Sequence, residues 1–317
     1  MRFAILGAGA VGGFYGALLS RAGNDVSVVA RGAHLEAIRE NGLRIESGAV
    51  GDFTARLGAE SDPARIGVVD TVIVAVKTYD NPTALPLLAP LVGPRTTVLT
   101  VQNGVESPEQ VAAVVGEGHT IGGATYIATA IDGPGVIKQT GSHRRVVCGE
   151  VFRAAPTVSE RVRAIETVMK AADIHAEAVP NGWPAIWEKF TFLAPFAAFT
   201  GGARLPLGPI WSDPDGRRAI LQAAAEVEAV ARASGIDLPG DLTPRREKYY
   251  STIPPSTRAS LLIDLSQGRR IEVESLLGAV VRRGRATGVN TPMIEALYAV
   301  LKPHAGGSEG LKEWNVT

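Results

Sequence analysis

The sequence contains little cysteine, no excess of either charge and no long hydrophobic run. Cys148 is the one cysteine among 317 residues, so no disulfide can form within the chain and nothing indicates an oxidising compartment. Since Cys148 ends an apolar run, we expect it to be a core residue rather than a catalytic thiol. No apolar stretch approaches the ~20 residues that span a bilayer. The amino terminus also lacks the cationic segment and cleavage site of a signal peptide, so we predict a cytoplasmic protein.

Charge and length exclude several classes of protein. The 32 basic and 32 acidic residues cancel, whereas a nucleic acid or a membrane surface as partner requires a cationic field. The five histidines are scattered and Cys148 alone could join them, so we predict no metal site. A hydrophobic content of 45% with 20% charged residues is typical of a soluble globular chain. A length of 317 residues favours two domains.

The first 180 residues alternate short β-branched runs with helical segments, which predicts a mostly parallel sheet covered by helices. Strands are expected at 2–6, 26–30, 71–76, 96–101, 119–128, 135–139 and 145–149. Helices are expected at 11–22, 33–40, 82–91, 108–115 and 158–171. Two further runs, 43–46 and 53–56, are separated by glycines and indicate a small hairpin.

After about Pro180 the pattern changes, because strand-like runs disappear and apolar residues recur at helical spacing. Helices are expected at 185–199, 217–234, 260–266, 270–287 and 292–301. The segment Pro180-Asn181-Gly182 suits a linker. We therefore predict an α/β domain over residues 1–180 and an all-helical domain over residues 181–317.

The most specific local signal is the segment Gly7-Ala8-Gly9-Ala10-Val11-Gly12, which follows the first predicted strand and opens a helix. In a dinucleotide-binding loop, Gly7 permits the tight turn, Gly9 lets the backbone approach a pyrophosphate and Gly12 lets the helix lie close to the strand. The helix N-terminus offers N–H groups and a partial positive charge to the phosphates. The alternative is a glycine-rich turn without a ligand, but the strands on either side favour the dinucleotide site.

Arg31 stands at the end of the second predicted strand, where an NAD-specific site has an acidic residue for the ribose hydroxyls. A guanidinium can instead form paired hydrogen bonds with a 2′-phosphate, so Arg31 predicts NADP(H) as the cofactor. The alternative for Arg31 is a solvated loop residue. His34 follows closely and could assist Arg31, but we expect it to have a surface role.

Polar residues follow two further apolar strands. Lys77 ends the run that begins at Thr71, and Gln102-Asn103-Gly104 ends the next one. Ligands of a doubly wound sheet bind outside the carboxyl ends of its strands. We therefore predict Lys77 and Asn103 as cofactor or substrate contacts, with ordinary strand-end polarity as the alternative.

Lys189 is the one cation between Trp187 and Phe199, a segment rich in phenylalanine. A helix that is apolar nearly all round is buried, and a buried ammonium must find a partner or lower its pKa. Either outcome suits a proton donor to a carbonyl oxygen under hydride attack. The alternative is a lysine whose ammonium reaches solvent at the domain surface.

Together these segments resemble the ketopantoate reductase (2-dehydropantoate 2-reductase) family over about residues 1–302. The resemblance is carried by Gly7 to Gly12, Arg31, Val76-Lys77, Gln102-Asn103-Gly104, Pro134-Gly135-Val136, Trp187-Glu188-Lys189 and the block from Ser260 to Glu272. It implies a Rossmann-type N-terminal domain, a helical C-terminal domain and an active site between them. The implied activity is NADPH-dependent reduction of ketopantoate to pantoate, on the route to pantothenate and coenzyme A.

The resemblance also implies residue roles. Lys189 resembles the proton donor, Asn103 an asparagine that contacts both ligands, and Glu272 a glutamate that contacts the cofactor. Ser260 resembles a substrate-binding serine, and Lys77 a cofactor lysine. Together Asn103 and Glu272 would fix the nicotinamide, the substrate and Lys189 relative to one another. On spacing alone, Glu272 could instead be an acid favoured by the start of a long helix.

The resemblance fails at three positions. The family has asparagines four and eight residues after the catalytic lysine and a third further on, and their side chains bind the substrate. This chain has apolar residues there: Leu193, Ala197 and Leu207. An apolar pocket selects weakly among substrates that differ by a hydroxyl. Either other polar residues replace the amides, with Arg204, Arg258 and Ser260 as candidates, or the substrate is a different, more apolar 2-oxo acid.

Two alternative functions stay open. One is NADPH-dependent reduction of a different 2-oxo acid, which the apolar residues after Lys189 favour. The other is a dinucleotide-binding sensor without turnover, because Rossmann domains also serve as regulatory modules. A small 2-oxo acid is the expected partner of the enzyme. A homodimer is compatible with the sequence, although nothing in it demands one.

Overall fold

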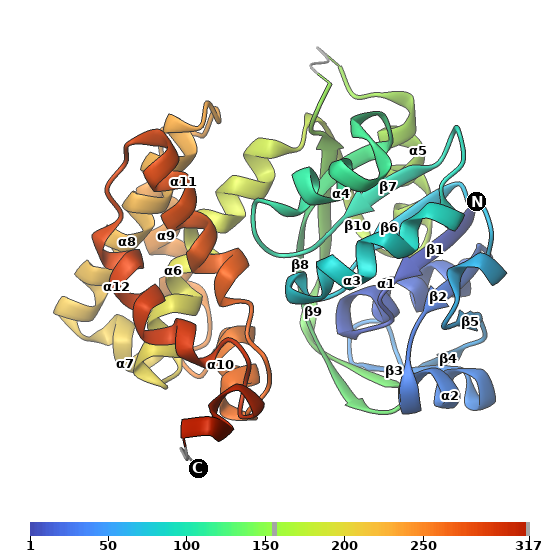
Figure 1. Cartoon of the computed structure of the whole chain (residues 1–317), viewed down its shortest axis with the longest axis horizontal. Coiled ribbons are helices and arrows are strands. Elements are labelled where there is room, and N and C mark those ends of the chain that lie inside the picture. Colours follow the sequence, from blue (N-terminus) through green and yellow to red (C-terminus); the bar gives the residue numbers. More distant parts are fainter. Residues whose placement is uncertain (154–156, 315–317) are drawn as a thin grey trace. The chain divides into compact units, whose positions relative to one another are not determined.

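The computed structural model describes residues 1–153 and 157–314, and the chain divides into two compact units (Figure 1). The first unit comprises residues 1–102 and 107–185, and the second comprises residues 103–106 and 186–317. A mostly parallel sheet in the first unit and helices in the second confirm the predicted fold class. The assignment of cofactor binding to one domain and catalysis to the other stays a prediction, and residues 315–317 of the predicted second domain lie outside the described residues.

One sheet runs through the first unit. Its strands are β1 (Arg2–Leu6), β2 (Asp25–Val29), β3 (Leu43–Ser47), β4 (Phe53–Ala55), β5 (Gly58–Glu60), β6 (Thr71–Val74), β7 (Thr97–Thr100), β8 (Thr120–Gly133), β9 (Val136–Glu150) and β10 (His175–Asn181). The order is β4-β3-β9-β8-β7-β6-β1-β2-β5, with β10 beside β9. Neighbouring strands are parallel except β8 with β9 and the predicted hairpin β3 with β4. The chain continues from β1 to one side and returns to β6 on the other, so the switch point of the sheet lies at β1.

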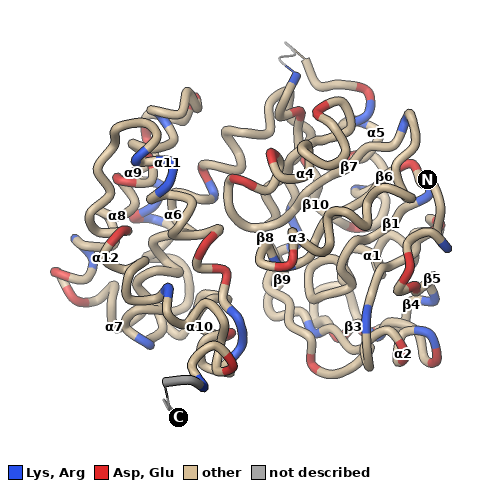
Figure 2. The backbone as a smooth tube through the Cα atoms, viewed as in Figure 1, with Lys and Arg blue, Asp and Glu red and all other residues tan. Residues whose placement is uncertain are grey.

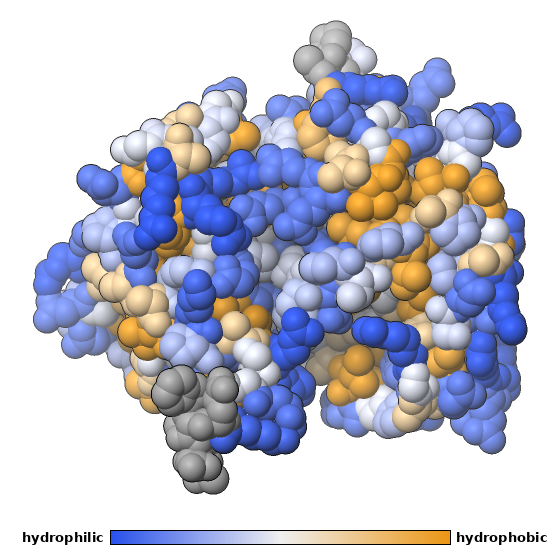
Figure 3. Space-filling model, in the orientation of Figure 1, coloured by the Kyte–Doolittle hydropathy of each residue, from blue (hydrophilic) through white to orange (hydrophobic). Residues whose placement is uncertain are grey.

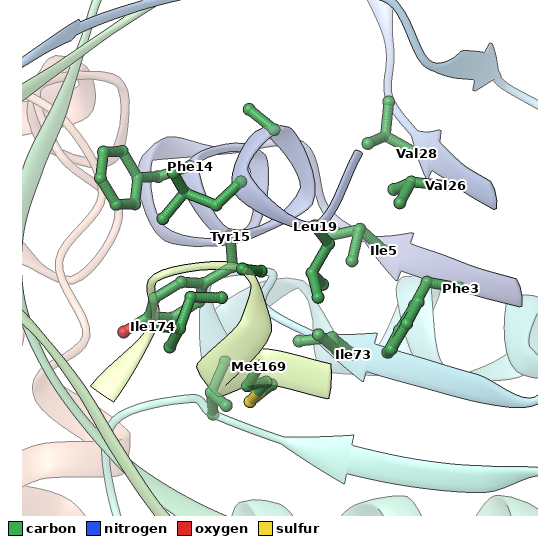
Figure 4. Packing of buried hydrophobic residues seen from close by; sticks show 14 of the residues in the cluster. Phe3, Ile5, Phe14, Tyr15, Leu19, Val26, Val28, Ile73, Met169 and Ile174 are labelled. Atoms are coloured by element: carbon green, nitrogen blue, oxygen red, sulfur yellow. The ribbon is translucent and has the colours of Figure 1, made fainter. Parts of the chain in front are cut away.

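Helices cover both faces of this sheet. They are α1 (Ala10–Arg21), α2 (Gly32–Asn41), α3 (Asn81–Ala84), α4 (Ser107–Val115) and α5 (Glu160–Ala171). The sheet has a hydrophobic core on each face. Alternate residues of β1 pack into these two cores, because successive side chains of a strand point to opposite faces. Phe3 and Ile5 pack with α1 and α5 (Figure 4), whereas Ala4 and Leu6 pack with α4. Cys148 is fully buried in the first of these cores, which confirms its predicted place.

Three predicted elements of the first unit differ from the structure. The runs at 135–139 and 145–149 belong to one long strand, β9, which pairs with β8 along most of its length. The helix predicted at 82–91 is α-helical only through Ala84 and continues as a 3₁₀ helix, Leu85–Leu91, because Pro86 and Pro90 cannot donate backbone hydrogen bonds. The predicted linker at Pro180 is the end of β10, an edge strand whose register shifts there.

The second unit is helical. Its helices are α6 (Trp183–Ala203, which begins in the first unit), α7 (Leu207–Ser212), α8 (Pro214–Ala233), α9 (Leu242–Thr252), α10 (Ser260–Ser266), α11 (Ala279–Thr287) and α12 (Pro292–Leu301), with a π-helical turn, η5, at Glu274–Gly278. Helix α8 packs against α7, α9, α11 and α12. Sequence patterning missed α9, because its buried positions, spaced by four, are Leu242, Arg246 and Tyr250. The guanidinium of Arg246 lies 2.6 Å from the Glu228 carboxylate.

The surface carries both charges throughout. Figure 2 shows Lys and Arg interspersed with Asp and Glu in both units, and Figure 3 shows hydrophilic residues over most of the drawn face, with smaller apolar areas. No described helix has the length and apolar character that a membrane span requires. Within residues 1–153 and 157–314, no group of three or more His, Cys, Asp or Glu residues could hold a metal ion.

Two glycines of the glycine-rich loop have different surroundings, since Gly12 is closely packed and the space beside Gly9 is open. A Cβ atom at Gly12 would overlap the Gly7 carbonyl oxygen and lie 2.9 Å from Ile5 Cγ2, whereas a Cβ atom at Gly9 would meet no heavy atom within 4 Å. We expect Gly12→Ala to lower the free energy of unfolding by about 1–3 kcal/mol through overpacking. Gly9→Ala should leave it nearly unchanged, because the φ of Gly9, −66°, suits alanine. Thermal unfolding of both variants tests this, and equal midpoints would contradict it.

Candidate active site

The glycine-rich loop lies at the carboxyl end of β1, the switch point of the sheet. Gly7 has a φ of +102°, and the N–H groups of Gly7 and Ala8 both donate to the Val29 carbonyl of β2 at 3.3 Å. Gly9 then caps α1. The packing of Gly12 against Ile5 brings the start of this helix close to the sheet, while the space beside Gly9 is open. A pyrophosphate requires this combination of close packing and open backbone.

Arg31 and Lys77 follow the two strands that flank β1. Arg31 caps α2, its side chain is 77% exposed, and one guanidinium nitrogen lies 3.6 Å from the Asp80 carboxylate. Lys77 is half-buried and precedes a short 3₁₀ turn that contains Asp80. An exposed guanidinium that pairs with one carboxylate at 3.6 Å can still bind a phosphate dianion.

Gln102 supports the end of β6. Its amide donates to the Val76 carbonyl at 2.8 Å and to Asn81 Oδ1 at 2.6 Å, and the Asn81 amide donates to Gln110 at 2.6 Å. Asn81 is buried. These bonds hold the segment around Lys77 to the loop after β7.

His34 is less exposed than we expected of a surface residue. His34 is half-buried in the first turn of α2, and its Nε2 lies 2.8 Å from the Ala8 carbonyl oxygen. The Gly135 N–H donates to Nδ1 at 3.0 Å. Both partners are backbone groups far away in the sequence, which residue patterns cannot show.

Lys189 and Asn103 meet in the second unit. Lys189 lies on α6, Asn103 lies three residues beyond the end of β7, and the lysine ammonium donates to Asn103 Oδ1 at 2.7 Å. Burial lowers the pKa of Lys189 to about 8, and the nearby Glu272 carboxylate counteracts this by favouring the charged form. At neutral pH the ammonium keeps its proton but releases it more readily than an ordinary lysine, as a general acid must.

The loop that carries Asn103 is fixed by residues of the second unit. Gly104 has a φ of +99°, and a Cβ atom there would lie 2.9 Å from the Ser275 carbonyl oxygen. Arg282 binds Glu106 and Glu274, each at 2.8 Å. The position of the Asn103 carbonyl is therefore set by a glycine that fits closely and by an ion-pair network.

Arg283 and Trp187 add a second support to this loop. Arg283 donates to the Val105 carbonyl at 3.4 Å, and its guanidinium lies 5.7 Å from the ring centre of Trp187. Trp187 is fully buried and stands two residues before Lys189 on α6. Sequence reasoning missed Arg282, Arg283 and Ser275 as supports, since nothing in the order of residues links α11 and the π-helical turn to the loop after β7.

Glu272 is buried but does not lie inside the predicted helix at 270–287. Helical structure begins at Val273 and passes at once into the π-helical turn Glu274–Gly278, in which the Ser275 hydroxyl donates to the Glu272 carbonyl at 3.2 Å. The carboxylate therefore belongs to the segment that precedes the helix. Such π-helical turns occur frequently at functional sites.

The remaining predicted residues occupy different surroundings. Ser260 is exposed as the first residue of α10. Leu193 and Ala197 follow Lys189 at intervals of four on α6 and so share its face, with Leu193 half-buried and Ala197 buried. Leu207 is buried as the first residue of α7. The face of α6 that carries the ammonium is thus apolar for two turns beyond it.

Comparison of the whole sequence with protein families gives matches in both halves. Residues 3–152 match the family described as "Ketopantoate reductase PanE/ApbA", and residues 181–305 match "Ketopantoate reductase PanE/ApbA C terminal". A 2-dehydropantoate 2-reductase from Mesorhizobium japonicum is 33% identical over 95% of this chain and 97% of its own length. A 2-dehydropantoate 2-reductase from a Nostoc species is 30% identical over 95% and 94%.

Solved structures also share the fold of this chain. A PanE/ApbA family ketopantoate reductase from Ralstonia eutropha superposes with a TM-score of 0.88 at 30% identity, covering 98% of this chain and 99% of its own. D-mandelate dehydrogenase, solved with NADH and anilino(oxo)acetate, shares the fold with a TM-score of 0.86 at 21% identity, covering 96% and 98%.

Proposed function

The chain belongs to the ketopantoate reductase PanE/ApbA family of oxidoreductases, and from this premise we propose that it reduces ketopantoate to pantoate with NADPH. The two relatives named above are 2-dehydropantoate 2-reductases, and D-mandelate dehydrogenase, which shares the fold, is solved with the nicotinamide cofactor NADH. NADPH as the particular cofactor, ketopantoate as the particular acid, and a place on the route to pantothenate and coenzyme A are our inference. The observation that carries the proposal is Lys189, with its lowered pKa and its hydrogen bond to Asn103.

The first unit supplies groups that fit the cofactor. The loop from Gly7 to Gly12 would hold the pyrophosphate, because Gly9 is open and α1 begins there. Arg31 would hold the 2′-phosphate with its exposed guanidinium, and Lys77 would add a second cation. When bound, the nicotinamide supplies the hydride that adds to C2 of the oxo acid.

The second unit supplies the proton. Lys189 donates a proton to the oxygen of the former carbonyl as negative charge develops there, so that one hydride and one proton together give the 2-hydroxy acid. Asn103 holds the ammonium in one orientation, and Glu272 favours its charged form. The neutral amine that remains takes its next proton from solvent. Ser260 is our candidate for the substrate carboxylate, as an exposed hydroxyl at the start of α10.

A second candidate function rests on the apolar face of α6. Leu193 and Ala197 lie one and two turns beyond Lys189 and offer no hydrogen bond to a substrate hydroxyl. A more apolar 2-oxo acid would fit such a face better than ketopantoate, which itself carries a hydroxyl in the substituent at C3. This candidate shares the cofactor, Lys189 and the reaction, and differs in the substituent at C3.

Turnover of NADPH with a set of 2-oxo acids tests the function and separates the two candidates. We expect oxidation of NADPH with ketopantoate, and a 10²–10⁴-fold loss of kcat in Lys189→Met, because general acid catalysis typically contributes that much. Lys170→Met, which removes an exposed lysine, should retain full activity.

The same set of acids separates the candidate functions. The second candidate would be favoured if the wild-type protein preferred an apolar oxo acid and Leu193→Asn shifted that preference toward ketopantoate. Tight NADPH binding without turnover of any acid would instead support the sensor.

Arg31 determines the expected preference for NADPH over NADH. We expect Arg31→Ala to raise the KM for NADPH by about 10–100-fold, since hydrogen bonds to a charged group contribute about 1.5–3 kcal/mol, and to leave the KM for NADH unchanged. Arg65→Ala, which removes a similarly exposed arginine of the same unit, serves as the control. Steady-state kinetics with both cofactors measures the ratio, and an unchanged ratio in Arg31→Ala would rule out its role.

A further inference from the structure

His34 connects two distant parts of the first unit through a single imidazole ring. One ring nitrogen, Nε2, lies 2.8 Å from the carbonyl oxygen of Ala8 in the glycine-rich loop. The other, Nδ1, accepts the N–H of Gly135 at 3.0 Å, at the turn between β8 and β9. The reaction proposed above uses neither His34 nor the segment Pro134-Gly135-Val136.

The two backbone partners determine which ring nitrogen donates and which accepts. A carbonyl oxygen can only accept a hydrogen bond, so Nε2 must carry the hydrogen that is donated to Ala8. A backbone N–H can only donate, so Nδ1 must be the unprotonated acceptor for Gly135. His34 therefore carries a hydrogen on Nε2, which it donates to the Ala8 carbonyl, and accepts the Gly135 N–H at Nδ1.

The bond to Ala8 orients the next backbone donor of the loop. A peptide unit is planar and trans, so its C=O and the following N–H point in opposite directions. The Ala8 carbonyl points to His34, and the Gly9 N–H of the same peptide must therefore point away from it. The Ala8 N–H is held in turn by the Val29 carbonyl at 3.3 Å, so this residue is tied on both sides.

Gly135 gives the ring a rigid anchor. Its carbonyl accepts the Arg44 N–H of β3 at 2.9 Å, so both backbone groups of Gly135 are bonded. Its φ is +73°, and a Cβ atom there would lie 2.9 Å from Ala37 Cβ on α2. The turn therefore fits closely against the helix that carries His34.

We propose that His34 is a positioning residue for the pyrophosphate of the cofactor. By holding the Ala8 carbonyl, it keeps the peptide that joins Ala8 to Gly9 in the orientation in which the Gly9 N–H is available to a phosphate oxygen. This inference rests on the proposed function, in which the glycine-rich loop binds the dinucleotide. It extends that function with a residue outside the loop that prepares the loop for binding.

Two variants of similar size separate the donated hydrogen bond from simple packing. Glutamine can place an amide N–H where Nε2 stands, whereas methionine fills similar space without a donor. We expect His34→Met to raise the Kd of NADPH and of NADH by the same factor, about 5–10-fold for one lost hydrogen bond. His34→Gln should remain within about twofold of wild type, because its amide keeps most of that bond. The kcat at saturating cofactor should not change in either variant.

Titration of each folded protein with NADPH and with NADH provides the readout, and His175→Met, at an exposed histidine of β10, is the control. Equal Kd values for wild type and both variants would overturn the inference and leave His34 as a structural tie. Equal losses in the methionine and glutamine variants, or a loss confined to NADPH, would also overturn it. Wild-type protein that binds neither dinucleotide would overturn the proposed function itself.

Discussion

An ammonium group that leaves water for an apolar helix loses hydration that few protein groups can replace. In α6 this group is Lys189, and neighbouring polar groups replace part of the lost hydration. Asn103 accepts one of its hydrogen bonds, and the Glu272 carboxylate stabilises its charge, yet burial still lowers its pKa to about 8. In the proposed reaction, a lysine with such a pKa would be an acid strong enough to release a proton near neutral pH and weak enough to hold it until negative charge develops nearby.

Much of the surrounding structure keeps those partners in place. Asn103 belongs to a short loop whose path depends on the close fit of Gly104 under Ser275 and on the pairing of Glu106 with Arg282. The loop backbone must be fixed for Asn103 to stay beside Lys189. If the Asn103 carbonyl moved away, the ammonium would lose a hydrogen bond that it needs in an apolar environment. The glycine-rich loop shows the same principle without charge, since His34 and Val29 hold Ala8 on both sides.

The sequence predicts the elements that repeat a local pattern. The alternation of strands and helices up to residue 180, the helices after it and the glycine-rich loop could all be predicted, because each depends on periodicity or on one residue type at fixed spacing. Lys189 could be singled out because a lone cation in an apolar helix breaks its own pattern. Helix α9 could not, since its buried stripe includes Arg246, whose ion pair with Glu228 replaces apolar packing.

Contacts between segments that are distant in the sequence could not be predicted from it, for a physical reason. The bonds of His34 go to backbone groups, which every residue carries, so no side-chain pattern distinguishes their partners. Arg282 and Arg283 look like two ordinary cations of an amphipathic helix, and only the folded chain brings them to the loop after β7. The start of helical structure at Val273, after Glu272, depends on a π-helical turn that no residue type specifies.

The pH dependence of kcat/KM in both directions tests the central claim, that Lys189 with its lowered pKa transfers the proton. Reduction of the oxo acid needs the charged lysine, so kcat/KM should fall as pH rises through about 8. Oxidation of the hydroxy acid needs the neutral amine and should rise through the same pH. Because Glu272 raises the pKa of Lys189, Glu272→Gln should move both transitions to lower pH. Rates that stay constant between about pH 7 and 9 in both directions would contradict the account.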